Sequence, residues 1–107
     1  MDYSKYFKNY SDSIKKILDE VDTDLIKDTV NLIKKIVKNK KKIYIIGNGG
    51  SSSIASHVSV DFTKVAKIPS INFNNANLIT CFANDFKYEN WVLESIKSYC
   101  DKKDLII

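Results

Sequence analysis

The sequence predicts an α/β fold, in which helices flank a small parallel sheet. Three short runs with strand patterns, at 43–46, 70–73 and 105–107, are separated by longer stretches with apolar residues at helical spacing. Because a helical stretch lies between consecutive strands, we expect the strands to run parallel. The length of 107 residues fits one small domain. The third strand falls at the end of the sequence, so we expect the sheet to be incomplete after it.

Two amphipathic helices are predicted before the first strand. Residues 3–20 carry aromatic and aliphatic side chains at helical spacing, and this apolar face packs either on the domain core or on a partner subunit. Residues 22–24 can cap a second helix, which ends at Asn39 and a run of lysines. We therefore expect an N-terminal helical pair over 1–40, followed by the unit that carries the sheet, over 41–107.

The elements after the first strand are expected to alternate between helix and strand. A third helix follows a Gly-rich turn and presents an apolar stripe to the core, formed by Ile54, Val58, Phe62 and Val65. The segments expected after it are a strand at 70–73, a polar turn at 74–77, short helices over 78–82 and 88–100, and a third strand at 105–107. Residues 84 and 85 then fall between two helices.

Charge and composition argue against a nucleic-acid-binding protein. The net charge of +4 comes entirely from lysine, because the chain has no arginine. Six lysines lie between Lys34 and Lys42; they form either a solvated helix end, which suits the helix dipole, or an anion-binding surface. Arginine supplies most bidentate recognition of bases and phosphates. A nucleic-acid partner is therefore not expected.

Hydropathy and cysteine usage favour a cytoplasmic protein. No apolar run approaches the roughly 18–20 residues that span a bilayer, and the start of the sequence lacks a secretory leader. Neither a membrane partner nor export is therefore expected. Cys81 and Cys100 form no Cys-x-x-Cys pair and are expected to be reduced thiols. Cys81, between Ile79 and Phe82, is predicted to be a core residue rather than a nucleophile.

The segment 47–53, Gly-Asn-Gly-Gly-Ser-Ser-Ser, is the most informative in the chain. It follows a predicted strand and opens a helix, where backbone N–H groups and the helix dipole favour an anion. It lacks the Gly-Lys-Ser/Thr ending of a Walker loop, and Ser52 stands where a dinucleotide fingerprint requires its third glycine. The segment is either a loop whose glycines let a ligand approach the backbone, or a tight turn with a serine cap and no ligand.

Two pairs of polar residues further along the chain are candidates for catalysis or ligand binding. His57, the only histidine, lies four residues before Asp61, so both project from one face of the third helix. They could bind a divalent metal or exchange protons with a substrate, although a zinc site needs three or four ligands. The alternative is a weak surface pair. Asn84 and Asp85 either cap a helix or lie at a site mouth near the carboxyl ends of the strands.

The stretches IYIIGNGGSSSIASHVSVDF and ITCFANDFKYENWV resemble the phosphoheptose isomerase branch of the sugar isomerase (SIS) domain family. The order of a helical pair, a strand, a GNGGS loop, a helix, a second strand, Asn-Asp and a further strand matches nearly the whole chain. The resemblance implies a SIS-type parallel sheet and an isomerase that converts sedoheptulose 7-phosphate to D-glycero-D-manno-heptose 7-phosphate through an enediol. It also implies a homotetramer and a place in lipopolysaccharide or capsule biosynthesis.

The resemblance also implies roles for individual residues. The substrate contacts fall on Asn48, Gly49, Gly50, Ser51, Asn84 and Asp85. His57 falls on a zinc ligand of the family. Asp61 falls on a carboxylate, usually Glu, that serves as metal ligand and catalytic base. Zn²⁺ is therefore the cofactor that the resemblance implies, with His57 and Asp61 as metal-binding and catalytic residues.

The chain departs from the family pattern in two ways. Asp61 in place of Glu shortens the base by one methylene, roughly 1.5 Å of reach, and a misplacement of about 1 Å can cost on the order of 100-fold in rate. The family's phosphate-binding Ser/Thr-rich loop and its remaining Gln and His residues would follow Ile107. We therefore expect the N-terminal part of a longer protein, or a truncated product that is inactive alone.

Two other functions are compatible with the sequence. One is a non-catalytic SIS module that binds a phosphosugar or bridges partners, which the change at Asp61 and the aromatic helix over 3–20 would allow. The other, less favoured, is a nucleic-acid binder that depends on its lysines. Such a protein should lose its affinity as salt rises.

Overall fold

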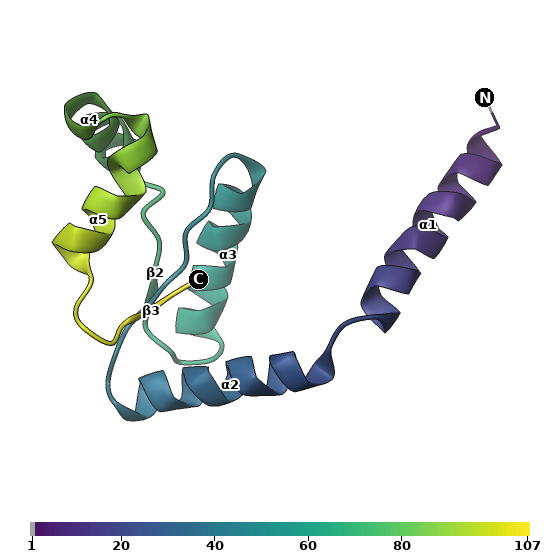
Figure 1. Ribbon diagram of the computed structural model, residues 1–107, viewed down its shortest axis with the longest axis horizontal. Helices are drawn as coiled ribbons and strands as arrows, with labels where there is room; N and C mark the ends of the chain where they lie inside the picture. Colours follow the sequence, from purple (N-terminus) through teal and green to yellow (C-terminus); the bar gives the residue numbers. More distant parts are fainter. Residues whose placement is uncertain (1) are drawn as a thin grey trace. The chain divides into compact units, whose positions relative to one another are not determined.

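A computed structural model describes residues 2–107 (Figure 1). Its elements, in chain order, are α1 (Tyr3–Asp19), α2 (Thr23–Lys38), β1 (Ile43–Tyr44), α3 (Gly50–Lys64), β2 (Ser70–Ile71), α4 (Ala76–Phe86), the 3₁₀ helix η1 (Tyr88–Asn90), α5 (Trp91–Tyr99) and β3 (Leu105–Ile106). This order confirms the predicted α/β fold with two helices before the first strand. Contacts divide the chain after Asn31 into two compact units, and each is described by itself. The predicted domain boundary at residue 40 stays a prediction.

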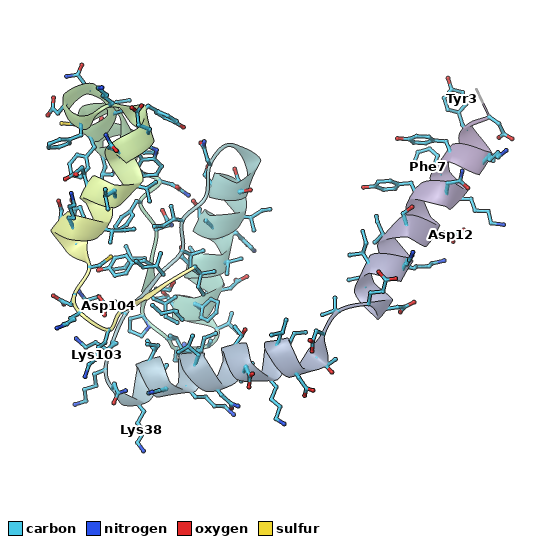
Figure 2. The ribbon with its side chains drawn as sticks, in the orientation of Figure 1. Tyr3, Phe7, Asp12, Lys38, Lys103 and Asp104 are labelled. Carbon is cyan, nitrogen blue, oxygen red and sulfur yellow. The ribbon has the colours of Figure 1, made fainter. Side chains whose placement is uncertain are left out.

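The first unit consists of α1 and the start of α2. Asp2 caps α1 by accepting a hydrogen bond from the backbone N–H of Lys5. Asp22 caps α2 in the same way, accepting from the N–H groups of Asp24 and Leu25, as the sequence predicts. None of the residues of α1 is buried, and Tyr3 and Phe7 project from the helix (Figure 2). The apolar face of α1 is therefore exposed.

The second unit is built on a three-stranded parallel sheet with strand order β2-β1-β3. Ile43 on the central strand is in register with Ser70 on one side and Leu105 on the other. Hydrogen bonds continue past the short strands, because the N–H of Ile45 donates to the carbonyl of Ile71 and that of Ile46 to the carbonyl of Ile107. The predicted parallel pairing is confirmed.

The central strand is buried on both faces, and each face has its own core. One core is formed by Ile36, Ile43, Ile45 and Ala55, so α3 and the end of α2 cover this side. The other is formed by Tyr44, Phe73 and Trp91, against which residues of α4 and α5 pack. Successive residues of β1 alternate between these cores, as the period of two in a strand requires. The result is a layer of helices on each side of the sheet.

The face that α3 turns to the sheet differs from the predicted stripe. Val58 and Phe62 pack against the core, but Ile54 is 65% exposed and Val65 is 71% exposed. The buried positions of α3 are instead Ala55 and Ser59. These two small residues lie one helical turn apart, which lets the helix lie close to the strands. The predicted stripe is therefore wrong at its two ends, Ile54 and Val65, because it rests on the larger apolar side chains alone.

Helix α4 is longer than predicted. Asn75 caps it, accepting hydrogen bonds from the N–H groups of Asn77 and Leu78, and the helix runs on to Phe86. The predicted position of residues 84 and 85 between two helices is therefore wrong, since both belong to the last turn of α4. Cys81 is exposed rather than in the core, because its neighbours Ile79 and Phe82 occupy the inner face of the helix. No helix among residues 2–107 has the length and apolar character needed to span a membrane.

Candidate functional site at the carboxyl edge of the sheet

The candidate site lies where β1 and β2 end. Because the strands are parallel, their carboxyl ends meet at one edge, and ligands of open α/β sheets bind at this edge. The segment 47–49 leads from β1 into α3, and the segment 72–75 leads from β2 into α4. Two of the sequence-predicted features, the Gly-rich loop and the asparagine-rich turn, are therefore neighbours.

Gly47 lets the loop fold back onto the helix that it opens. A Cβ atom at this position would collide with the backbone carbonyl of Ser51 and come within 2.8 Å of the backbone nitrogen of Ser52. Gly49 has a positive φ of 56°, which side chains disfavour. Gly50 has open space where a Cβ would lie. Local backbone geometry thus favours glycine at two of the three positions, whether or not a ligand binds.

The start of α3 is capped differently from the prediction. The N-cap is Gly49, without a side-chain hydrogen bond to the helix, so the predicted serine cap is wrong. The side-chain oxygen of Asn48 accepts the N–H of Gly49 at 2.9 Å, and the Ser52 hydroxyl donates to the carbonyl of Gly49. Ser51 is exposed. The N–H of Gly50, as the first helical residue, has no acceptor within the helix, and free N–H groups at a helix start favour an anion.

Asparagines of the turn after β2 hold α3 in place. The Asn74 side-chain nitrogen donates to the carbonyl of Ser52 and to the Ser56 hydroxyl. The Asn72 side-chain nitrogen donates to the Ser59 hydroxyl at 2.9 Å. The sequence predicts only a strand position for Asn72 and a turn for Asn74. Their pairing with small serines on the inner face of α3 is a tertiary contact, and no local signal in the sequence indicates it.

His57 and Asp61 form the predicted pair on α3. The His57 Nε2 and Asp61 Oδ2 atoms are 3.4 Å apart, with 79% and 53% of the two side chains exposed. They lie roughly 10 Å and 16 Å along the helix from Gly50, at about 1.5 Å per residue. Asp61 also lines a pocket of about 390 Å³ whose other walls are apolar, formed by Val58, Phe62, Val65 and Ala66. The pair is open to a ligand or to a further chain.

The donor set fits a zinc ion only in part. An imidazole nitrogen and a carboxylate oxygen are zinc ligands, but zinc takes three or four from the protein. No group of three or more His, Cys, Asp or Glu side chains able to hold a metal occurs within residues 2–107. The described residues therefore offer two candidate donors and do not complete a zinc site.

Asn84 and Asp85 lie at the end of α4, where their side chains contact each other. The Asn84 amide nitrogen donates to Asp85 Oδ1 at 3.0 Å, and Cys81 Sγ lies 3.9 Å from Asp85 Oδ2. Both residues are exposed. No hydrogen bond or ion pair among the described residues joins this pair to His57 or Asp61, so the structure does not bring the two predicted pairs together.

One contact at this edge involves a residue that the sequence analysis does not single out. The Tyr88 hydroxyl donates to the side-chain oxygen of Asn48 at 2.9 Å. Tyr88 lies in η1, which follows α4 directly. The hydrogen bond therefore connects the Gly-rich loop to the segment that carries Asn84 and Asp85.

Comparison with known proteins agrees with this architecture. The SIS domain family model matches residues 5–106. This chain belongs to the SIS domain family. Its relatives include the phosphoheptose isomerase of Helicobacter pylori (strain P12), 29% identical over 96% of this chain and 56% of that protein. The phosphoheptose isomerase of Thermodesulfovibrio yellowstonii is 31% identical over 96% of this chain and 55% of that protein.

A solved structure supports the fold. The structure of phosphoheptose isomerase GmhA from Neisseria gonorrhoeae superposes with a TM-score of 0.86 at 17% identity, over 99% of this chain and 59% of that chain. The predicted resemblance to the phosphoheptose isomerase branch of the SIS family is thus confirmed. The chain spans about half the length of the curated relatives that it matches. The predicted roles of the site residues stay predictions.

Proposed function

We propose that this chain carries part of the active site of a sugar-phosphate isomerase of the phosphoheptose isomerase type. The observation that carries the proposal is a SIS domain whose Gly-rich loop lies at the carboxyl edge of the sheet and opens the helix with the exposed His57–Asp61 pair. The names of the relatives support the same activity. The reaction proposed is the conversion of sedoheptulose 7-phosphate to D-glycero-D-manno-heptose 7-phosphate.

The chemistry requires proton transfers only. A base removes the proton from the carbon next to the carbonyl, and the carbonyl oxygen gains a proton, which yields a cis-enediol. The proton then returns to the former carbonyl carbon, while the neighbouring hydroxyl loses its proton and becomes the new carbonyl. We assign the base to Asp61, with His57 at 3.4 Å as its neighbour in proton transfer. Hydrogen-bond donors at the loop would stabilise charge on the oxygens.

We assign substrate binding to residues on two sides of the carboxyl edge of the sheet. The Gly-rich loop contributes Asn48, Gly49, Gly50 and Ser51, and the end of α4 contributes Asn84 and Asp85. The loop offers the free N–H of Gly50, and α4 offers exposed amide and carboxylate groups that suit sugar hydroxyls.

We also propose a Zn²⁺ ion as cofactor, with His57 and Asp61 as two of its ligands and the others from outside residues 2–107. When bound, the ion would polarise the substrate oxygens as a Lewis acid. Imidazole and carboxylate are suitable donors for zinc, and both side chains are exposed.

We further propose that the protein forms a homo-oligomer, specifically a homotetramer. The face of α1 exposes Tyr3, Tyr6, Phe7 and Tyr10. Exposed apolar patches of this kind mark interaction sites. We place the protein in the cytoplasm, where its product would supply lipopolysaccharide or capsule biosynthesis.

The test is turnover of sedoheptulose 7-phosphate by the full-length protein, purified with and without added Zn²⁺. Formation of heptose 7-phosphate, abolished in Asp61→Asn, is the expected result. The change from the family's usual Glu to Asp61 favours a second candidate, a SIS module that binds a phosphosugar without converting it. That function predicts a rise in Tm with the sugar phosphate and no turnover, and this outcome would overturn the isomerase proposal.

A further inference from the structure

The Asn48 side chain is held by two hydrogen bonds to the same atom. Its oxygen accepts the Tyr88 hydroxyl at 2.9 Å and the backbone N–H of Gly49 at 2.9 Å. Asn48 and Tyr88 are 40 positions apart in the chain. The first contact is therefore tertiary, whereas the second lies within the Gly-rich loop.

The bond from the Gly49 N–H determines which end of the amide faces outward, and the Tyr88 hydroxyl adds a second anchor to the same oxygen. If the amide were rotated by half a turn, its NH₂ group would face the N–H of Gly49, and two donors would meet. The observed orientation leaves the Asn48 Nδ2 atom free, because it makes no hydrogen bond with any described residue. Asn48 is exposed, so this nitrogen is an unoccupied donor at the carboxyl edge of the sheet, beside the first residue of α3.

Tyr88 is placed for this contact by the turn that precedes it. Lys87 has a positive φ of 70°, which is uncommon for a residue other than glycine. It ends α4 and directs the chain into η1. The Tyr88 hydroxyl consequently reaches across from the end of α4 to the loop after β1.

We propose that Tyr88 is a positioning residue, which anchors the Asn48 amide in the orientation set by the Gly49 N–H, so that Nδ2 donates a hydrogen bond to an acceptor oxygen of the bound sugar phosphate. This inference rests on the proposed function, because it takes the ligand to be a sugar phosphate. Tyr88 acts through Asn48 and does not itself contact the reacting atoms. Without the hydroxyl, the amide oxygen keeps only its bond to the Gly49 N–H, so the side chain is held at one point instead of two and is more mobile.

The kinetic test uses Tyr88→Phe and Asn48→Ala, singly and together, in the full-length protein with sedoheptulose 7-phosphate. Tyr88→Phe should raise KM roughly three- to tenfold, the range of one hydrogen bond, with a smaller effect on kcat. In the Asn48→Ala background the same change should have no further effect, since the two residues act as one unit. Equal effects in both backgrounds, or an unchanged KM, would overturn the inference.

A matched control separates the hydroxyl from the ring. Tyr99, the last residue of α5, is also an exposed tyrosine, and its hydroxyl makes no hydrogen bond with the described residues. Tyr99→Phe should therefore leave KM unchanged. A similar rise in KM for both variants would mean that loss of a tyrosine hydroxyl acts without Asn48.

A second readout does not need turnover. The side-chain NH₂ signals of Asn48, assigned by their loss in Asn48→Ala, should be rigid by NMR relaxation in the wild type and more mobile in Tyr88→Phe. They should shift when sedoheptulose 7-phosphate is added. Absence of turnover in the wild type would contradict the proposed function alone. Unchanged mobility in Tyr88→Phe, or no shift with the sugar phosphate, would overturn the positioning role.

Discussion

The carboxylate of Asp104 accepts the backbone N–H of Lys42 at 3.0 Å, although the two residues are 62 positions apart. Its other oxygen accepts the N–H of Asp101 at 2.9 Å. Asp104 lies in the turn before β3, next to Lys103 (Figure 2). Lys42 directly precedes β1. One side chain thus shapes the turn and joins the beginnings of two neighbouring strands.

The first prediction concerns this junction. Asp104→Asn replaces one acceptor oxygen with an NH₂ group that would face a backbone N–H, so we expect the free energy of unfolding to fall by about 1–2 kcal/mol. Urea denaturation of the two proteins measures the difference. Asp101→Asn is the control: its side chain forms only an exposed pair with Lys42 at 3.4 Å, worth about 0–1 kcal/mol. A larger loss for the control would contradict the assignment.

The second prediction is the pH dependence of that effect. Partial burial raises the pKa of Asp104, but hydrogen bonds from the N–H groups of Lys42 and Asp101, with the charges of Lys42 and Lys41, outweigh burial and hold the pKa below its ordinary value. Its contribution to stability is therefore present above the unfolded pKa of about 3.9 and is lost as pH falls through the folded pKa. The difference between wild type and Asp104→Asn should shrink from pH 6 to pH 3, whereas a constant difference would refute this.

The third prediction concerns the Gly-rich loop. Gly47→Ala places a methyl group against the backbone of Ser51 and Ser52, so the loop must shift and stability should fall by about 1–3 kcal/mol. Gly50→Ala is the matched control, because its Cβ meets open space and alanine favours a helix. Thermal unfolding compares the two variants. Equal melting temperatures would show that the backbone does not make this close approach.

The fourth prediction separates function from stability at His57 and Asp61. The pair is exposed, so His57→Ala and Asp61→Ala should each change the free energy of unfolding by less than about 0.5 kcal/mol. Under the proposed function, kcat of both variants of the full-length protein should fall by at least about 100-fold. Metal analysis should also show that both variants have lost bound zinc. Asp61→Glu should retain activity. Wild-type turnover in Asp61→Ala would remove Asp61 as the base.

The fifth prediction concerns the exposed face of α1. Phe7→Ser removes an apolar side chain that is 67% exposed and should shift the full-length protein toward smaller assemblies, measured by light scattering after size-exclusion chromatography. Asp12→Asn serves as a control, because five positions at about 100° per residue place it on the opposite side of the helix. An unchanged assembly in Phe7→Ser would show that this face does not mediate association.

Elements with a strong local pattern could be predicted from the sequence. The apolar run from Ile43 to Ile46 predicts a buried strand, and the structure buries Ile43 completely. Asp22 caps α2 because its acceptor lies beside free N–H groups. The predictions failed where small or polar residues decide the packing: Ala55 and Ser59 form the inner face of α3, although neither is strongly apolar.

The candidate site shows the same division. Spacing along the chain suffices to predict that a Gly-rich loop leads from a strand into a helix and that His57 and Asp61 share a helix face. That Tyr88 holds Asn48 and that Asn74 holds the start of α3 is visible only in the folded chain. Such hydrogen bonds depend on segments that meet only after the sheet has formed, and no spacing along the chain encodes them.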